Sequence, residues 1–363
     1  MKFKYFFLSL FIISCIKNDK VQINADEIHD IVVIDSNIET DSLFTIIGVG
    51  DIMLGTNFPS EKHLPPKGLN LLKPMYDIIQ SADVSFCNLE GAVADSGGKA
   101  KTCSDPKICY AFRQPEYLMK DLKGAGFDLI SIANNHIFDF GYDIALNTAK
   151  VLDEYGFRFA GTDFKPWDTL TVKGRKIGFA AFAPNPGTIS IINYDVARKI
   201  ITHLDSISDI VIVSFHGGAE GKKALNVTRD YEEFYGDNRG NVYEFAHNVI
   251  DFGADVVFGH GPHVTRAIEI YKDRFIAYSL GNFCTYDRFN ISGLSGIAPV
   301  IKLKVDSNGK FEEGEIISIK QIGRGEPIID ESKAALKELI RLTNEDFPEN
   351  RIIFEDIIFR NKD

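Results

Sequence analysis

The sequence of 363 residues lacks the short motifs that identify several large classes of protein. It contains neither a phosphate-binding loop nor a glycine-rich dinucleotide-binding loop, and no internal repeat is evident. A surplus of basic residues is also absent, since 40 Lys and Arg face 51 Asp and Glu and the formal net charge is -11. Because phosphate backbones are bound by clustered Lys and Arg, this balance argues against a nucleic-acid partner.

A long hydrophobic run is missing from the amino terminus, where the apolar segment 5–13 is too short to span a membrane comfortably. This segment follows a basic start, which is typical of a secretory signal. Residues 12–15, Ile-Ile-Ser-Cys, resemble the bacterial lipobox, in which the cysteine, here Cys15, is lipidated. We expect a lipoprotein signal peptide over 1–15, or else a plain signal peptide or an uncleaved anchor, and a flexible tether over 16–43. The mature protein would be exported and lipid-anchored to the bacterial cell envelope.

Cysteine is scarce, with five residues in the chain. Outside the cytoplasm two close thiols usually oxidise, so Cys103 and Cys109, which share a polar loop, are predicted to form a disulfide. A zinc knuckle would need two further ligands nearby, and none is present. Cys87 and Cys284 lie singly in apolar runs and are expected to be free and buried.

Short β-branched runs alternate with helical stretches from residue 44 onward. This alternation predicts an α/β protein with a largely parallel central sheet and helices on its faces. The expected strands cover residues 44–50, 83–88, 127–132, 158–160, 176–182, 209–215, 255–259, 265–271 and 274–279. The expected helices cover residues 70–81, 115–124, 142–155, 193–206 and 239–252.

The pattern changes after about residue 296. We assign residues 44–300 to one main domain and residues 301–363 to a C-terminal extension. Strands at 298–305 and 313–322 would form a hairpin around an Asp-Ser-Asn-Gly turn across this boundary, and a helix would follow at 331–342.

Acidic, amide or histidine side chains follow five of the expected strands at the point where each strand ends. They are Asp51, Asn88 with Glu90, Asn134 with Asn135 and His136, His216, and His260 with His263. Ligands gather at the carboxyl ends of strands in such sheets, so we expect these side chains to lie together. Each could instead be a helix cap or a solvated turn residue, but five clusters at strand ends are hard to obtain by accident. Imidazoles with carboxylates favour Zn, Mn or Fe over Mg or Ca, which predicts a divalent-metal site.

Six motifs resemble, in the same order, those of the CapA family of bacterial capsule-synthesis proteins, the poly-γ-glutamate type. They are Gly50-Asp51-Ile-Met-Leu-Gly55, Asn88-Leu-Glu-Gly91, Ala133-Asn-Asn-His136, Phe215-His-Gly-Gly218, Gly259-His-Gly-Pro-His263 and Tyr278-Ser-Leu-Gly-Asn282-Phe283. The fold of that family is similar to that of calcineurin-like metallophosphoesterases. The resemblance therefore implies a layered α/β sandwich with a central mostly parallel β-structure and flanking helices.

The resemblance also implies ligands for one or two metal ions. The first ion would be held by Asp51 and His263, the second by Asn135, His216 and His260, with Glu90 bridging the two. Two ions that share a carboxylate can generate hydroxide and stabilise an in-line displacement.

Catalysis would fall to His136, acting on the leaving group as a general acid, and to Asn134 in the same motif. The chain departs from the phosphoesterase pattern at two positions. Met53 replaces a histidine two residues after the first aspartate, and Glu90 replaces a bridging aspartate. Because a thioether is a poor ligand for a hard divalent ion, the site could hold one metal only, or serve binding alone.

Three further residues are candidates for substrate binding. Arg113 has a guanidinium suited to bidentate recognition of a carboxylate, although it could equally pair with a structural acid. Glu220 could bind a cationic group or be solvated. Asn282, at another strand end, could orient the substrate or bind a backbone group.

These residues support three hypotheses about function. The first is an exported, metal-dependent hydrolase that acts on an anionic cell-surface polymer such as poly-γ-glutamate. The second is a non-catalytic component that holds this polymer or contacts membrane synthase subunits. The third is a phosphoesterase.

Overall fold

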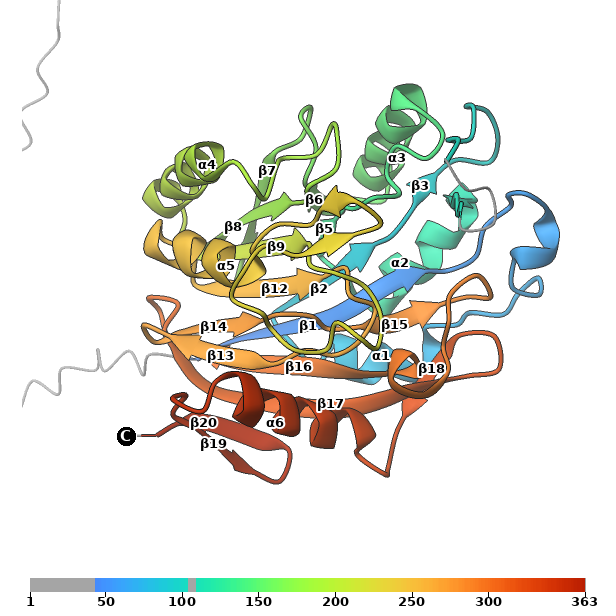
Figure 1. Cartoon of the computed structure of the whole chain (residues 1–363). Coiled ribbons are helices and arrows are strands. Elements are labelled where there is room, and N and C mark those ends of the chain that lie inside the picture. Colours follow the sequence, from blue (N-terminus) through green and yellow to red (C-terminus); the bar gives the residue numbers. More distant parts are fainter. Residues whose placement is uncertain (1–42, 104–108, 363) are drawn as a thin grey trace, which may run out of the picture. The chain divides into compact units, whose positions relative to one another are not determined.

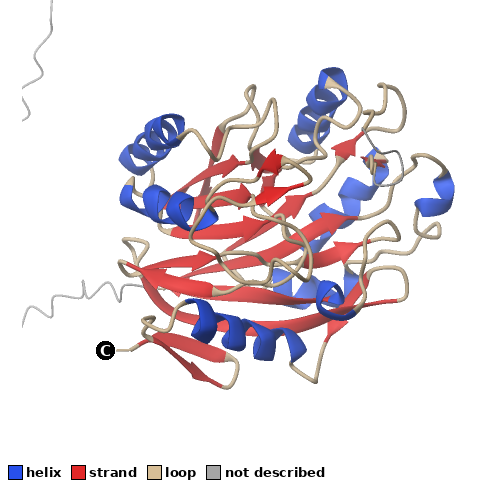
Figure 2. Cartoon of the chain, in the orientation of Figure 1, coloured by secondary structure: helices blue, strands red, loops and turns tan. Residues whose placement is uncertain are grey.

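Two β-sheets packed face to face form the centre of the computed structural model, which describes residues 43–103 and 109–362 (Figure 1). Helices lie on the outer sides of the sheets (Figure 2). Phe86 and Phe258, one from each sheet, stack with 5.2 Å between their ring centres within a core of buried aliphatic and aromatic residues. The expected fold class, a layered α/β sandwich with a mostly parallel centre and flanking helices, is confirmed.

The first sheet has the strand order β19-β20-β17-β16-β1-β2-β5-β6, with β15 paired to β1 and β18 paired to β17. Strands β1, β2, β5, β6 and β15 pair in parallel, whereas β16 to β20 pair antiparallel. The bounds are β1 (Phe44–Met53), β2 (Val84–Leu89), β5 (Leu129–Ser131), β6 (Arg158–Ala160), β15 (Asn282–Thr285), β16 (Ile297–Val305), β17 (Phe311–Ile322), β18 (Glu326–Ile329), β19 (Ile352–Glu355) and β20 (Ile358–Asn361).

The second sheet has six strands in the order β13-β14-β12-β9-β8-β7. Its four central strands are parallel, and β13 and β7 pair antiparallel at the two edges. The bounds are β7 (Trp167–Val172), β8 (Arg175–Phe182), β9 (Ile210–His216), β12 (Val256–His260), β13 (Ile268–Tyr271) and β14 (Arg274–Ala277). Two small pairs complete the strands, namely β3 (Ala92–Val93) with β4 (Arg113–Gln114), and β10 (Glu233–Phe234) with β11 (Asp237–Asn238).

The helices pack their apolar faces on the sheets. They are α1 (Tyr76–Ile79), α2 (Met119–Ala125), α3 (Tyr142–Glu154), α4 (Tyr194–Ile207), α5 (Val242–Asp251) and α6 (Ala334–Asp346). Residues of α1, α2 and α3 share a core with the first sheet, and residues of α4 and α5 share one with the second. Among the described residues, no helix combines the length and the apolar character needed to cross a membrane.

Sequence patterns explain these elements locally. Strands β9 and β12 are buried along their whole length, which matches their continuous apolar runs and their position between other parallel strands. Helix α4 buries Ala197, Ile201 and Leu204, which are spaced so that they lie on one face. The side chain of Asn193 caps its first turn by accepting a hydrogen bond from the backbone N–H of Val196.

The structure differs from the sequence prediction in a few elements. The helix expected at 70–81 is a short 3₁₀ turn, Lys73–Met75, followed by the single turn of α1. Pro74 explains the interruption, because its ring removes the backbone donor that an α-helix through this point would use. The sequence analysis did not predict strands β3, β4, β7, β10, β11, β15, β18, β19 and β20. The hairpin predicted after residue 298 forms as β16 and β17, and β16 lies directly beside β1 in the first sheet.

Candidate functional site

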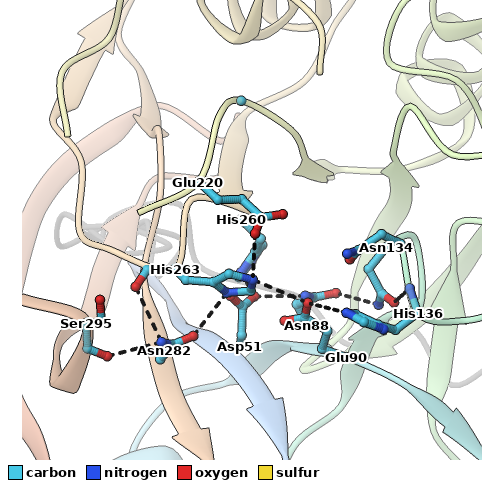
Figure 3. Close-up of polar contacts among 12 residues, drawn as sticks. Asp51, Asn88, Glu90, Asn134, His136, Glu220, His260, His263, Asn282 and Ser295 are labelled. Atoms are coloured by element: carbon cyan, nitrogen blue, oxygen red, sulfur yellow. Dashed lines mark hydrogen bonds and ion pairs between the residues drawn. The ribbon is translucent and has the colours of Figure 1, made fainter. Parts of the chain in front are cut away.

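The polar clusters meet where the carboxyl ends of parallel strands from both sheets come together (Figure 3). In the first sheet, Asp51 of β1 lies beside Asn88 of β2 on one side and Asn282 of β15 on the other. In the second sheet, His216 of β9 lies beside His260 of β12. The register of the parallel strands thus places side chains that are far apart in sequence in one site.

Asp51 connects several residues of this site through hydrogen bonds. Its Oδ1 accepts hydrogen bonds from Asn88 Nδ2 at 2.8 Å and from His260 Nδ1 at 3.1 Å, and its Oδ2 accepts one from His263 Nδ1 at 3.0 Å. Burial alone would raise the pKa of Asp51, but its contacts with the two histidines hold that pKa well below the usual range. Asp51 is therefore a fixed, ionised carboxylate.

A glycine is required immediately before this carboxylate. The backbone N–H of Asp51 donates to the carbonyl of Gly281 at 2.8 Å, which brings β1 close to the turn before β15. A Cβ added at Gly50 would lie 2.0 Å from the same carbonyl oxygen. The Gly-Asp sequence at the end of β1 is thus a steric necessity of the site.

Glu90 is fully buried, yet neither of its carboxylate oxygens has a hydrogen-bond partner in the described structure. Its Oε1 lies 3.6 Å from His263 Nε2 and 3.7 Å from His136 Nε2. Burial raises the pKa of Glu90 well above its ordinary value. A nearby cation would reverse this shift, because it favours the ionised carboxylate.

Further buried polar atoms of the predicted ligands lack hydrogen-bond partners. They are both ring nitrogens of His216, Nε2 of His260 and Oδ1 of Asn135. Leaving such a group unpaired costs about 1–3 kcal/mol, so several together indicate a missing partner. Burial, helped by the charge of Arg239, lowers the pKa of His216 well below its ordinary value, which keeps its imidazole neutral. Neutral imidazoles and carboxyl or amide oxygens are the donor set of a divalent transition metal, so these residues fit a metal ion.

A second group of ligand atoms adjoins the first. Donor atoms of Asp51, Glu90 and His263 all lie within 4.8 Å of one another. The carboxylates of Glu90, Glu220 and Asp51 raise the pKa of His263 to about 10, against the effect of its burial. Glu90 therefore lies beside Asp51 and His263.

Met53 takes no part in either set of donors. It is completely buried, and its Sδ accepts a hydrogen bond from the backbone N–H of Gly55 at 3.3 Å. The sulfur atom is thus satisfied within its own turn.

His136 sits beside Glu90 with a carboxylate behind it. Its Nδ1 donates to Asp139 Oδ2 at 2.7 Å, while its Nε2 faces Glu90. Asp139 also pairs with Lys101 Nζ at 2.6 Å and accepts from the backbone N–H of Phe112 at 2.7 Å. Burial lowers the pKa of His136, and Asp139 opposes that effect. This arrangement fixes the ring orientation and presents Nε2 to the site.

Asn134 has all its polar atoms engaged within the protein. Its Nδ2 donates to Asn88 Oδ1 at 3.2 Å and to the carbonyl of Leu89 at 2.9 Å, and its Oδ1 accepts from the backbone N–H of His136 at 3.1 Å. The residue lies inside the site and links β2 to the turn that carries His136. Its contacts are those of a positioning residue.

A cavity of about 590 Å³ opens beside the metal-ligand candidates. It is lined by Lys101, Cys103, Tyr110, Phe112, Asn135, His136, Asn185, Glu220, Phe234, Tyr235, Asp237, Arg239, His263, Arg288, Phe289 and Asn290. Three of these side chains are cationic, and several are aromatic. Such a lining can hold an extended anionic ligand against the site.

The three substrate-binding candidates occupy different places. Glu220 lines the cavity, where its Oε1 pairs with Arg239 Nη2 at 3.2 Å. Asn282 Oδ1 lies 3.1 Å from His263 Nδ1, and Nδ2 of the asparagine donates to the carbonyl of Ser295 at 3.1 Å, so it orients the histidine.

Arg113 does not reach the cavity. Its Nε donates to Asn57 Oδ1 at 2.8 Å, and its guanidinium lies 4.7 Å from the centre of the Phe140 ring. The arginines that do line the cavity are Arg239 and Arg288, which the sequence analysis did not single out. One feature of the sequence could have indicated that Arg288 lies near the site, because this residue follows shortly after the motif that contains Asn282.

The cysteines are distributed as follows. Cys103 and Cys109 form a disulfide next to the cavity. Cys87 and Cys284 are free and buried. Cys15, with the rest of the predicted signal peptide, lies outside the described residues.

Comparison with protein families gives one match that covers most of the folded region. A family described as bacterial capsule synthesis protein PGA_cap matches residues 45–287. The chain is similar to capsule biosynthesis protein CapA of Bacillus anthracis, with 28% identity over 66% of this chain and 59% of the relative. It is also similar to PGA biosynthesis protein CapA of Bacillus subtilis, with 27% identity over 75% of this chain and 71% of the relative. The match thus spans less than two thirds of the Bacillus anthracis protein.

Comparison with solved structures gives more distant likenesses. A hypothetical protein from Thermus thermophilus superposes with a TM-score of 0.47 and 15% identity, over 76% of this chain and 99% of the other. A 5′-nucleotidase precursor from the same organism superposes with a TM-score of 0.43 and 14% identity, over 85% of this chain and 59% of the other.

Proposed function

Because the chain belongs to the bacterial capsule synthesis protein PGA_cap family, we propose that it is a metal-dependent hydrolase acting on an anionic cell-surface polymer of the poly-γ-glutamate type. The Bacillus subtilis relative is described as a PGA biosynthesis protein, which supports this substrate class. Two observations carry the hydrolase assignment: donor atoms of Asp51, Glu90 and His263 lie within 4.8 Å of one another, and buried ligand atoms of Glu90, Asn135, His216 and His260 have no hydrogen-bond partner. These atoms lie next to a cavity large enough for a segment of polymer.

We propose two metal positions. Asp51 and His263 would hold one ion, and Asn135, His216 and His260 would hold the other, with Glu90 between them. A bound Zn, Mn or Fe ion supplies an activated water molecule at neutral pH and polarises the group under attack. Asn88 donates a hydrogen bond to Asp51, and Asn282 Oδ1 accepts one from His263 Nδ1, so both ligands are held in a fixed orientation.

His136 is the proton donor in this proposal. Hydrolysis of an amide or ester needs a proton on the departing nitrogen or oxygen, and Nε2 of His136 is the ring atom that faces the site. Asp139 accepts from Nδ1 and so keeps a proton available on the opposite nitrogen when the ring is charged. Lys101 shares Asp139 and limits how strongly that carboxylate holds the ring proton.

A second function is favoured by one specific observation. Met53 stands where a histidine ligand is expected, and its sulfur is bonded to the backbone of Gly55 instead. The proposed metal position at Asp51 and His263 therefore has fewer ligands than the proposed position at His216 and His260. A non-catalytic component that uses the same cavity to hold the polymer, or to contact membrane synthase subunits, is the alternative that this deficit supports.

Metal analysis of the full-length chain tests the proposal. We expect one or two equivalents of Mn, Zn or Fe in the purified wild type, and about one equivalent fewer in His216→Ala, because that side chain has two free nitrogens in the site. The variant should also lose cleavage of a γ-linked glutamate polymer. His203→Ala is the matched control, since His203 is an exposed residue of α4 that packs on Trp167 and is not among the proposed ligands.

The outcomes separate the three functions. A chain that binds no metal and cleaves nothing, with His216→Ala indistinguishable from the wild type, would leave only the binding role. Two equivalents of metal with turnover of a phosphodiester, and none of the polymer, would make it a phosphoesterase.

We also propose that the chain is exported and anchored by lipid at Cys15, through a tether that ends where β1 begins. Cys15→Ser removes the only thiol to which the lipid would attach in this segment, so the variant should move from the membrane fraction to the soluble fraction. Fractionation with immunodetection measures this. Retention of the serine variant in membranes would refute lipid anchoring and favour an uncleaved apolar anchor.

A further inference from the structure

Arg288 differs from the other two cationic residues that line the cavity. Lys101 is paired with Asp139 at 2.6 Å, and Arg239 is paired with Glu220 at 3.2 Å. Arg288 forms no ion pair with a carboxylate among residues 43–103 and 109–362. Its positive charge is therefore available to a ligand in the cavity.

The guanidinium of Arg288 is held in place without being neutralised. It lies over the ring of Tyr110, 5.1 Å from the ring centre, and its Nη1 donates to Nε2 of His63 at 3.5 Å. His63 in turn donates from Nδ1 to Asp287, which fixes the histidine tautomer that accepts from Arg288. A guanidinium has five N–H donors, so most of them remain free for an oxyanion. Because the side chain is already ordered, binding costs little conformational entropy.

An aromatic wall leads from Arg288 to the site. Phe289, the next residue, packs edge-on against His263 with 5.2 Å between ring centres and stacks on Phe112 at 5.1 Å. Phe112 in turn contacts the ring of His136 at 4.4 Å. A ligand group bound at Arg288 is thus joined to the reacting position by a continuous apolar surface, along which the aliphatic part of a glutamate unit can lie.

We propose that Arg288 is a specificity-determining residue that binds a substrate carboxylate other than the group being hydrolysed. The inference rests on the proposed function and adds how the site selects an acidic polymer. A γ-linked glutamate chain carries one free carboxylate per unit, and a guanidinium binds a carboxylate through two parallel hydrogen bonds. This contact would place the scissile amide at a fixed distance from Arg288, beside His136.

Equilibrium binding tests this without depending on turnover. The full-length chain with His136→Ala is titrated with a short γ-linked glutamate oligomer, and the titration is repeated after Arg288→Gln and Arg288→Lys are added. We expect Arg288→Gln to weaken binding about tenfold or more, as loss of a charged hydrogen bond predicts, and Arg288→Lys to weaken it less. An oligomer whose carboxylates are converted to carboxamides should bind weakly and equally to all three.

Arg198→Gln is the matched control. Arg198 is an exposed arginine of α4 that also lies over an aromatic ring, with 4.7 Å to the centre of Phe252, and it does not line the cavity. This change should leave the affinity for the oligomer unaltered. A tenfold loss with Arg198→Gln as well would mean that net charge governs binding, which contradicts the inference.

Three other results would overturn the inference. Equal affinity of Arg288→Gln and its parent for the acidic oligomer would remove Arg288 from recognition while leaving the proposed hydrolase intact. No binding of the oligomer by the parent would defeat both the inference and the proposed substrate class. If inorganic phosphate displaces the oligomer from the parent at lower concentration than free glutamate does, the position selects phosphate over carboxylate.

Discussion

Replacement of His136 by alanine is expected to lower kcat for the polymer about 10²–10⁴-fold, the range typical for loss of a general acid. The reason is geometric, because Nε2 of His136 faces Glu90 at 3.7 Å while Asp139 holds Nδ1 of the same ring. The amount of bound metal should remain that of the wild type, because His136 is not among the proposed ligands.

A substrate with an easy leaving group separates proton donation from other roles of His136. A γ-glutamyl nitrophenyl ester needs little protonation of its leaving group, so His136→Ala should slow its hydrolysis far less than that of the amide-linked polymer. Equal losses on both substrates would indicate that His136 merely shapes the site. Asp139→Asn should fall between the wild type and His136→Ala, since it removes the carboxylate that holds Nδ1 at 2.7 Å.

Replacement of Arg266 by methionine is expected to lower the free energy of unfolding by about 3–5 kcal/mol, as breaking a buried ion pair does. The guanidinium of Arg266 is completely buried. Its Nη1 and Nη2 bind the two oxygens of Glu232 at 2.8 and 2.7 Å, and its Nε donates to the carbonyl of Ala224 at 2.7 Å. Methionine would leave Glu232 as an unpaired buried carboxylate. Denaturant unfolding followed by circular dichroism measures the loss.

A double replacement and a surface control sharpen this experiment. Arg266→Met with Glu232→Leu should recover a large part of the lost stability, because the unpaired charge is then gone. Arg341→Met removes an exposed arginine that pairs with Glu338 and Glu345 on α6, and should change stability by less than about 1 kcal/mol. A loss below about 1 kcal/mol for Arg266→Met would contradict the role assigned to this ion pair.

The ion pair between Arg266 and Glu232 also holds a loop that lines the cavity. The loop between β9 and α5 carries Glu220 and Arg239, both of which line the cavity. Arg266 donates to the carbonyl of Ala219 at 3.2 Å, while Glu232 accepts from the backbone N–H of Ala219 at 2.8 Å. Loss of the pair would therefore loosen the segment that holds Glu220 in addition to destabilising the fold.

Much of the candidate site could be predicted from the sequence, because its residues lie at the ends of strands. Asp51, His216 and His260 follow apolar runs directly, and the parallel register of the strands brings such positions together whatever the loops do. The central strands were recognisable for the same reason, because a strand buried on both faces is apolar along its length.

Residues in loops were much harder to place. Arg113 and Arg288 both occur beside aromatic residues in polar segments, and nothing local distinguishes them. Only tertiary packing decides that Arg113 is held by Asn57 and Phe140 while Arg288 lines the cavity. Likewise, the edge strand β7 has only one fully buried residue, so its apolar pattern is weaker than that of the buried strands.

The hydrogen bond from His263 to Asp51 joins residues 212 positions apart in the chain. Contacts of such long range can form only after most of the backbone between them has been ordered, since closing a loop of this length is entropically unfavourable until other contacts support it. Asp51 and Glu90 reside in one sheet region and His216 and His260 in the other. No single segment of the chain, and neither sheet alone, contains all of these ligands. The ligand set is therefore complete only when the two sheets have packed together in the native fold.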